Sequence, residues 1–183
     1  MRINASTPIL ETPRLQVRRV ASSDGSFFLR LLNDPSWLEN IGDRGVHSDA
    51  DAESYIKNSI WAHYHINGYG MYAVQLKSTS LPIGICGLVK RDFLSAPDLG
   101  FALLPDYVGQ GFASEAARGL MLHAQNKLGI GRLYAIARRG NYRSVRLLDR
   151  LGFRYAGPYA TPEGEQVELY ATLSEGEGLT WGC

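Results

Sequence analysis

The sequence predicts an α/β or α+β fold with one right-handed β–α–β crossover near its middle. Segments with strand patterning alternate with segments of helical periodicity, in the order β, α, α, β, β, β, α, β, α, β, β. The third helical segment follows a glycine-containing loop and connects two strands, as a crossover helix does. With 183 residues and 45% hydrophobic content, the chain suits a single domain over residues 1–183.

The N-terminal third predicts one strand and two helices. Residues 14–19 alternate between polar and apolar side chains, which predicts a strand. Residues 24–33 predict a short helix that the following Asp-Pro step ends. Residues 47–65 begin with Ser48, a candidate N-cap, and with acidic side chains that favour the positive end of a helix. Apolar residues then recur at helical spacing, which predicts the second helix.

The middle of the chain predicts three strands and then the longest helix. Residues 70–77 and 82–91 flank a polar turn and predict a hairpin. Residues 98–104 predict the next strand, which a proline ends. Residues 113–128 place small and apolar side chains on one helical face, and Gly129 ends this helix.

The last part of the chain predicts a strand, a short helix and two closing strands. The strand covers residues 132–139, and the helix covers 141–153 with Asn141 as its N-cap. The closing strands cover 153–160 and 165–173. The whole pattern therefore predicts seven strands.

Two glycines stand directly before the longest helix. A helix start leaves about four backbone N–H groups unsatisfied and carries partial positive charge. Gly109 and Gly111, followed by Ala113, would let a ligand approach those groups, which predicts an anion-binding loop; a plain tight turn is the alternative. A P-loop requires a lysine after the second glycine, and a dinucleotide fold requires a third glycine where Ser114 stands. Both nucleotide-binding motifs are therefore disfavoured.

Composition disfavours several classes of partner. The formal charge is +1, so no overall field favours nucleic acid or a membrane surface. The longest apolar runs fall short of the roughly 20 residues that span a bilayer, and the N-terminus lacks a signal-peptide pattern. Cys86 and Cys183 form no disulfide framework. His63 and His65 would point in different directions on a helix, so we expect no metal site. The cysteine count and the N-terminus together lead us to expect a cytoplasmic protein.

Four motifs, in order along the chain, resemble the GNAT N-acetyltransferase superfamily: LETPRLQVR, PIGICGL, DLGFALLPDYVGQGFASEA and NYRSVRLLDRLGF. The likeness is greatest to the RimJ/RimL branch, the ribosomal-protein N-terminal acetyltransferases, and runs from about residue 9 to 173. It implies a mixed, mostly antiparallel twisted sheet of six to seven strands with helices on both faces. It also implies a V-shaped splay between the fourth and fifth strands that holds acetyl-CoA, the cosubstrate.

The resemblance also implies which residues bind the cosubstrate. The pyrophosphate loop of the family falls on Val108, Gly109, Gln110, Gly111, Phe112 and Ala113. Val108 replaces the Gln or Arg of the wider superfamily, which affects a side-chain contact but not the backbone amides. Leu103 would offer backbone hydrogen bonds to the acetyl and pantetheine end, and Asn141 matches an asparagine beside the pantetheine arm.

For the chemistry, the resemblance implies direct attack of an amine on the thioester in a ternary complex. Asp98 is the candidate base, acting through water, with capping of a strand as the alternative role and Glu168 as the second choice. Leu148 stands where many relatives carry a tyrosine acid. Ser144 is the candidate hydrogen-bond donor to the leaving sulfur, with hydrogen bonding in the first helical turn as the alternative. Cys86 is expected to be a buried, inert thiol.

The acceptor is expected to be a primary amine, on a peptide N-terminus or on a small molecule. Residues 34–53 carry six acidic residues against one arginine. We therefore expect Trp37, Glu39 and Asp43 to face the acceptor and the negative charge to attract a cationic amine; core packing and helix capping are the alternatives. The alternative function is a CoA-binding sensor or interaction module that has lost turnover. A homodimer is compatible with the sequence.

Overall fold

The computed structural model describes residues 7–173, which form one eight-stranded sheet with helices around it. The ends of the predicted single domain, including Cys183, lie outside these residues. The sheet order is β1-β2-β3-β4-β5-β6-β8-β7. Its strands are β1 (Pro8–Glu11), β2 (Leu15–Arg18), β3 (Met71–Leu76), β4 (Pro82–Val89), β5 (Asp98–Leu103), β6 (Tyr134–Arg138), β7 (Arg154–Ala160) and β8 (Gln166–Ala171).

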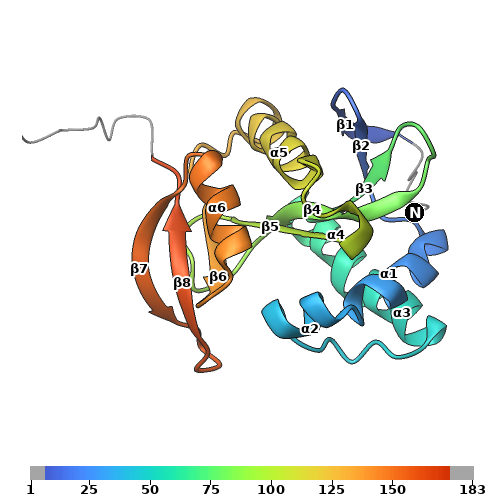
Figure 1. Cartoon of the computed structure of the whole chain (residues 1–183), viewed down its shortest axis with the longest axis horizontal. Helices are drawn as coiled ribbons and strands as arrows, with labels where there is room; N and C mark the ends of the chain where they lie inside the picture. Colours follow the sequence, from blue (N-terminus) through green and yellow to red (C-terminus); the bar gives the residue numbers. More distant parts are fainter. Residues whose placement is uncertain (1–6, 174–183) are drawn as a thin grey trace, which may run out of the picture.

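The sheet splays open between β5 and β6. Every other neighbouring pair is antiparallel, whereas β5 and β6 are parallel and share a single register pair, Asp98 with Tyr134. Beyond that pair β6 follows β8 over five residue pairs, and β5 follows β4. Figure 1 shows β5 crossing the middle of the molecule while β6 runs with β7 and β8. These are the fourth and fifth predicted strands, so the V-shaped splay is confirmed.

Helices cover both faces of the sheet (Figure 1). The helical layer on one face comes from the N-terminal third, and α5 lies on the other face against β1, β2, β4 and β5. The helices are α1 (Gly25–Leu32), α2 (Pro35–Asn40), α3 (Asp49–Tyr55), the π-helix η2 (Ile56–Trp61), α4 (Ala62–Asn67), α5 (Phe112–Leu128) and α6 (Tyr142–Arg150). Short 3₁₀ turns are η1 (Ser22–Asp24) and η3 (Pro105–Tyr107).

Different side chains hold the two helical layers. Beyond Phe112 in its first turn, the buried residues of α5 are three alanines and Leu120, so the helix axis can approach the strands closely. On the opposite face Tyr64 of α4 stacks on Tyr72 of β3, with ring centroids 5.4 Å apart. The indole Nε1 of Trp61 donates to the carbonyl of Val20 at 2.8 Å, which anchors this helical layer to the end of β2.

Three sequence predictions need correction. The sheet has eight strands rather than six to seven, because Pro8–Glu11 pairs with β2 despite its short length. The Asp-Pro step does more than end α1: Asp34 accepts a hydrogen bond from the backbone of Ser36 at 2.9 Å and so caps the new helix α2. The helix predicted over 47–65 is interrupted by a π turn.

No helix within residues 7–173 is long and apolar enough to cross a membrane.

Candidate active site

A cleft of about 970 Å³ passes through the splay between β5 and β6. It is lined by both strands, by the loop before α5, by the start of α6, and by α2 and η2 from the N-terminal helical layer. The lining includes these predicted site residues: Asp98, Leu103, Val108, Gly109, Gly111, Phe112, Ala113, Asn141, Ser144 and Trp37. The fold therefore brings together residues from opposite ends of the sequence at one opening.

The loop before α5 presents an uninterrupted row of free amides. Within the described residues, nothing accepts a hydrogen bond from the backbone N–H groups of residues 109 to 114. Gly109 and Gly111 have φ of +84° and +82°, a conformation that side-chain-bearing residues rarely adopt. These glycines turn the chain so that the six amides lie at the N-terminus of a 17-residue helix. Such a row of donors, at the positive end of a helix, suits an anion.

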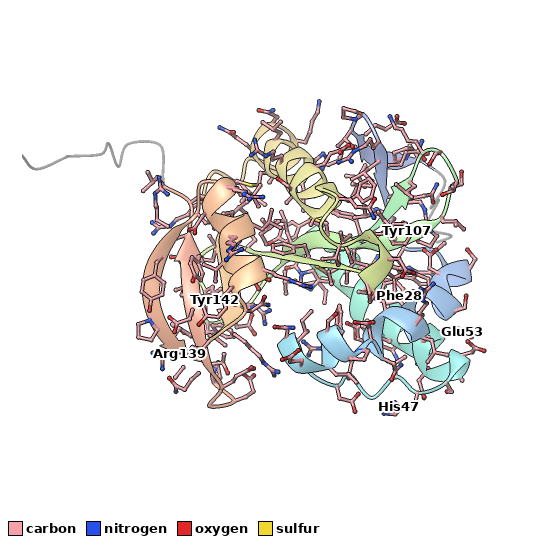
Figure 2. The ribbon with its side chains drawn as sticks, in the orientation of Figure 1. Phe28, His47, Glu53, Tyr107, Arg139 and Tyr142 are labelled. Carbon is pink, nitrogen blue, oxygen red and sulfur yellow. The ribbon has the colours of Figure 1, made fainter. Side chains whose placement is uncertain are left out.

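Some side chains of the same loop line the cleft, and others point away from it. Val108 is 40% exposed and lines the cleft, and the buried ring of Phe112 lines it as well. Gln110 does not line the cleft, because its amide Nε2 turns back and donates to the carbonyl of Asp106 at 2.8 Å. Figure 2 shows Tyr107, at the end of η3, beside the start of α5.

The start of α6 supplies two polar groups to the cleft. Asn141 caps this helix, its Oδ1 accepting from the backbone N–H of Ser144 at 3.2 Å. The Nδ2 of Asn141 and the hydroxyl of Ser144 have no hydrogen-bond partner within residues 7–173. Ser144 thus joins the first helical turn through its backbone N–H, and its hydroxyl stays a candidate donor. Both groups are available as donors beside the splay.

Asp98 lies at the point where β5 and β6 diverge. Asp98 is only 3% exposed, and its carboxylate accepts from Arg91 Nε at 2.6 Å. Burial raises the pKa of Asp98, and the attraction of Arg91 opposes that rise without cancelling it. A carboxyl group with a raised pKa beside a cleft is suited to proton transfer near neutral pH.

Comparison with known proteins identifies the family. The chain matches the family model of the acetyltransferase (GNAT) domain over residues 14–154. The chain belongs to the GNAT acetyltransferases. Members of this family use acetyl-CoA, so the predicted enzyme class and cosubstrate are confirmed.

Individual relatives agree with this assignment. The uncharacterized N-acetyltransferase YoaA of Bacillus subtilis (strain 168) is 26% identical over 152 residues, which cover 82% of this chain and 85% of that protein. Among solved structures, the ribosomal-protein-S5-alanine acetyltransferase of Vibrio fischeri has a TM-score of 0.75 and 20% identity, covering 91% of this chain and 97% of its own. An acetyltransferase of Salmonella typhimurium that modifies the N-terminal serine of ribosomal protein L7/L12 has a TM-score of 0.76 and 21% identity, covering 91% and 99%. Both structures share the fold of this GNAT protein.

The acceptor side of this GNAT enzyme differs from the expectation. Trp37 lines the cleft, although it is mostly buried and its Nε1 donates to the carbonyl of Gly42 at 3.1 Å. Glu39 and Asp43 do not line the cleft. Asp43 instead accepts from the backbone of Gly45 at 2.7 Å, so part of the acidic segment serves local turns. Figure 2 shows Glu53, also from that segment, at the outer margin of the helical layer.

Arginine dominates the charge of the cleft. Six arginines line it against three carboxylates: Arg44, Arg91, Arg138, Arg143, Arg146 and Arg150 against Asp34, Asp98 and Glu165. Two of the carboxylates are paired, Asp98 with Arg91 and Glu165 with Arg138, at 2.6 Å in each case. The third, Asp34, caps α2. The remaining four arginines have no carboxylate partner within residues 7–173.

Two further residues of this cleft, Arg138 and His63, make hydrogen bonds there that the sequence did not predict. Arg138 ends β6 and also donates to the carbonyl of Glu39 at 2.6 Å, which ties α2 to the β7–β8 turn. His63 lines the cleft, and its Nε2 accepts from the backbone N–H of Lys90 at 3.0 Å. Burial lowers the pKa of His63, in keeping with a neutral ring that accepts there. No sequence motif marks either residue, because their partners lie far away in the chain.

Two other features stay outside the chemistry. Cys86 is buried in β4, and burial raises the pKa of its thiol to about 12, so no reactive thiolate forms near neutral pH. Glu168, the second choice for a base, does not line the cleft; its carboxylate accepts from the hydroxyl of Tyr155 at 2.5 Å. In the part of the chain that the structure describes, no three His, Cys, Asp or Glu side chains gather where a metal could bind.

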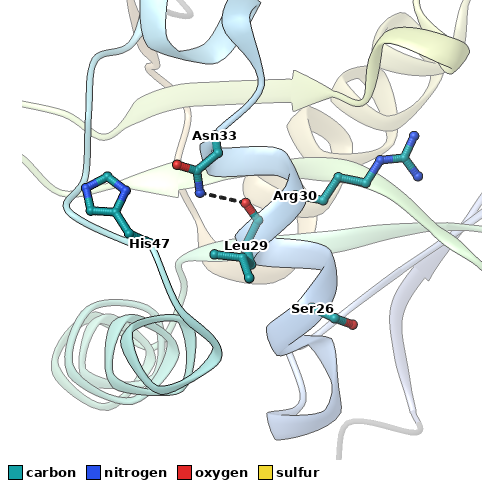
Figure 3. A pocket seen from close by; sticks show the side chains of 5 residues that line it. All are labelled: Ser26, Leu29, Arg30, Asn33 and His47. Atoms are coloured by element: carbon teal, nitrogen blue, oxygen red, sulfur yellow. Dashed lines mark hydrogen bonds between the residues drawn. The ribbon is translucent and has the colours of Figure 1, made fainter.

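A second hollow lies between α1 and the segment before α3 (Figure 3). Ser26, Leu29, Arg30, Asn33 and His47 line it. The Nδ2 of Asn33 donates to the carbonyl of Leu29 at 2.8 Å and to that of Val46 at 2.7 Å, so both of its hydrogens are used. The hollow is thus a seam between two elements that Asn33 joins.

Proposed function

We propose that the chain transfers the acetyl group of acetyl-CoA to a primary amine, on a peptide N-terminus or on a small molecule, by direct attack in a ternary complex. The observation that carries this proposal is the row of six free amides at residues 109 to 114, at one side of a cleft that passes through the sheet. A diphosphate would satisfy several of these donors at once, each worth about 1.5–3 kcal/mol for a charged acceptor.

The rest of the cleft suits the remainder of the cosubstrate. The backbone edges of β5 and β6 have no ladder to each other beyond Asp98 and Tyr134, so Leu103 can offer main-chain groups to the pantetheine arm. The free Nδ2 of Asn141 adds a donor on the facing side. Arg143, Arg146 and Arg150 line the α6 wall, have no carboxylate partner among residues 7–173, and suit the remaining phosphate. The cosubstrate supplies an acetyl group activated as a thioester.

The chemistry requires few protein groups. The amine nitrogen forms a bond to the acetyl carbon, the carbon–sulfur bond breaks, and the sulfur leaves as a thiolate. The proton lost by the amine passes through water to Asp98, whose raised pKa suits this role. The hydroxyl of Ser144 donates a hydrogen bond to the departing sulfur. Holding both reactants in line contributes several further kcal/mol, on the order of 7–11 in well-oriented systems.

The charge of the cleft favours acceptors with a single amine over polycations. Each carboxylate in the lining is already used by an arginine or by a helix cap, while Arg44, on the α2 side, has no carboxylate partner in the described part of the chain. A polyamine or an aminoglycoside would find no free carboxylate there. Two structural neighbours are named as acetylating an alanine or a serine of ribosomal proteins. Peptide N-termini are therefore the first acceptors to test.

The test is a measurement of thiol release from acetyl-CoA with a panel of amines. The panel contains N-terminal peptides that begin with serine or alanine, small amino compounds, a polyamine and an aminoglycoside. We expect release with at least one monoamine acceptor and little with the polycations. Tight CoA binding without release for any acceptor would favour the sensor function instead. Release only with polycations would overturn the acceptor assignment.

A further inference from the structure

Arg14 contacts the phosphate-binding loop from behind. It lies in the turn between β1 and β2 and does not line the cleft. Its Nη1 donates to the carbonyl of Gln110 at 3.0 Å, and its guanidinium carbon lies 4.3 Å from the ring centre of Phe112. Arg14 thus contacts the residues on either side of Gly111, from a position 96 residues earlier in the chain.

The contact with Gln110 fixes the orientation of one peptide plane. The carbonyl of Gln110 and the N–H of Gly111 belong to the same planar peptide unit and point in opposite directions. A carbonyl held toward Arg14 therefore directs the N–H of Gly111 away from Arg14. Glycine permits mirror-image backbone conformations at little cost, so this peptide could otherwise rotate. The hydrogen bond from Arg14 removes that freedom before any ligand arrives.

Glu115 in turn holds Arg14. Its Oε2 accepts from Arg14 Nε at 2.7 Å, and its Oε1 accepts from the backbone N–H of Arg14 at 2.9 Å and from the hydroxyl of Thr12 at 2.6 Å. Burial alone would raise the pKa of Glu115, but these hydrogen bonds outweigh it and lower the pKa. Glu115 is therefore ionised near neutral pH, and the positive charge of Arg14 is matched at close range.

We propose that Arg14, held by Glu115, is a positioning residue that orients the Gly111 amide toward the diphosphate of CoA. The inference rests on the proposed CoA site. Because Glu115 neutralises Arg14, the effect is orientation rather than long-range attraction. Lysine at this position would keep the charge but could not pair with Glu115 and reach the Gln110 carbonyl through one planar fork.

The test compares CoA binding by titration calorimetry in wild type, Arg14→Lys and Arg14→Met. The matched control is Arg30→Met, since Arg30 forms an exposed ion pair with Asp106 just before the same loop but donates to no loop carbonyl. We expect the Kd for CoA to rise about tenfold or more in both Arg14 variants and to stay within about twofold of wild type in the control. The melting temperature of each variant is measured alongside.

A second readout separates orientation of the diphosphate site from general damage. S-acetylpantetheine lacks the diphosphate, so kcat/KM with this donor should be unchanged in Arg14→Lys while kcat/KM with acetyl-CoA falls. Equal losses with both donors, or wild-type CoA affinity in both Arg14 variants, would overturn the inference. Failure of the wild-type protein to bind CoA would instead overturn the proposed function.

Discussion

At the scale of single residues, the candidate site depends on main-chain groups that particular side chains leave free or hold in place. Gly111 has a positive φ and is the N-cap directly before α5, and the amides on both sides of it have no acceptor in the described part of the chain. Asn141 uses one side-chain atom to cap α6 and leaves the other free. The proposed function therefore depends on the groups that these residues leave unpaired as well as on the hydrogen bonds that they make.

The first prediction concerns the two glycines at the ends of α5. Gly111 and Gly129 both have left-handed conformations, with φ of +82° and +68°. Alanine costs about 1–2 kcal/mol in that conformation, so Gly111→Ala and Gly129→Ala should lose similar stability. Only Gly111→Ala should weaken CoA, by about tenfold, in calorimetric titration. Equal CoA affinity in the two variants would show that the loop conformation is irrelevant to binding.

The second prediction concerns the pH profile set by Asp98. A base must be deprotonated, so kcat falls as pH drops through its pKa, and burial places that fall at higher pH than for an ordinary aspartate. Asp98→Asn should lower kcat by about 100-fold or more. In Arg91→Met the pKa of Asp98 should rise further, because Arg91 lowers it, which moves the acidic limb to higher pH. An acidic limb that stays in place in Arg91→Met would argue against Asp98 as the base.

At the scale of elements, two helix N-termini face one another across the splay. The start of α5 supplies free amides, and the start of α6 supplies the Nδ2 of Asn141 and the hydroxyl of Ser144. β5 and β6 carry these helix starts and diverge from a single register pair. The parallel crossover thus places both N-termini at the same, open end of the V.

The third prediction separates the two roles of Asn141. Aspartate can accept the hydrogen bond from the Ser144 backbone but lacks an amide donor, whereas alanine can do neither. Asn141→Asp should keep the melting temperature and raise KM for acetyl-CoA, and Asn141→Ala should also lose about 1 kcal/mol of stability. Thermal unfolding and steady-state kinetics check both parts. If Asn141→Asp kept the wild-type KM, the free Nδ2 would have no part in binding.

The limits of sequence reasoning also appear at this scale. Periodicity and the resemblance identified seven of the eight strands and the position of the splay, because those signals are local or carried by motifs. β1 was missed because its four residues carry too little pattern, and α2 because a proline after an aspartate can end one helix or begin another. The link from Arg14 to Glu115 spans 101 residues and depends on tertiary packing, so no local pattern indicates it.

The sequence placed both loop glycines at the cleft that the structure shows, while their part in binding CoA stays a prediction. Gly109 and Gly111 stand out in the sequence because few positions demand glycine before a helix. Glu39 and Asp43 were expected to face the acceptor but do not line the cleft, because an acidic run does not reveal which helical face meets a cleft. The catalytic role of Asp98 and of Ser144 stays a prediction.

At the scale of the whole molecule, charge is nearly balanced overall but not within the cleft. The chain carries a formal charge of +1, whereas the cleft lining has six arginines against three carboxylates. A concave, low-dielectric surface concentrates such an excess. We therefore expect the cleft to attract an anionic cosubstrate locally, and we expect no general attraction of polyanions to the surface.

The fourth prediction follows from this local charge. The Kd for CoA should rise with added salt, because the Debye length falls to about 3 Å at 1 M ionic strength and charges then attract each other less. Arg146→Gln should reduce that salt dependence, because Arg146 lines the cleft. Arg139→Gln is the control, since Arg139 is 92% exposed and outside the lining. If the Kd for CoA depended on salt concentration equally in Arg146→Gln and in wild type, Arg146 would have no part in binding the phosphates of CoA.

The central claim is that the amides of residues 109 to 114 bind the diphosphate of CoA. A crystal structure of the wild-type protein with CoA tests it most directly. The account predicts diphosphate oxygens within about 3 Å of several of these nitrogens, including that of Gly111. A diphosphate bound elsewhere, with the loop amides still facing solvent, would contradict it.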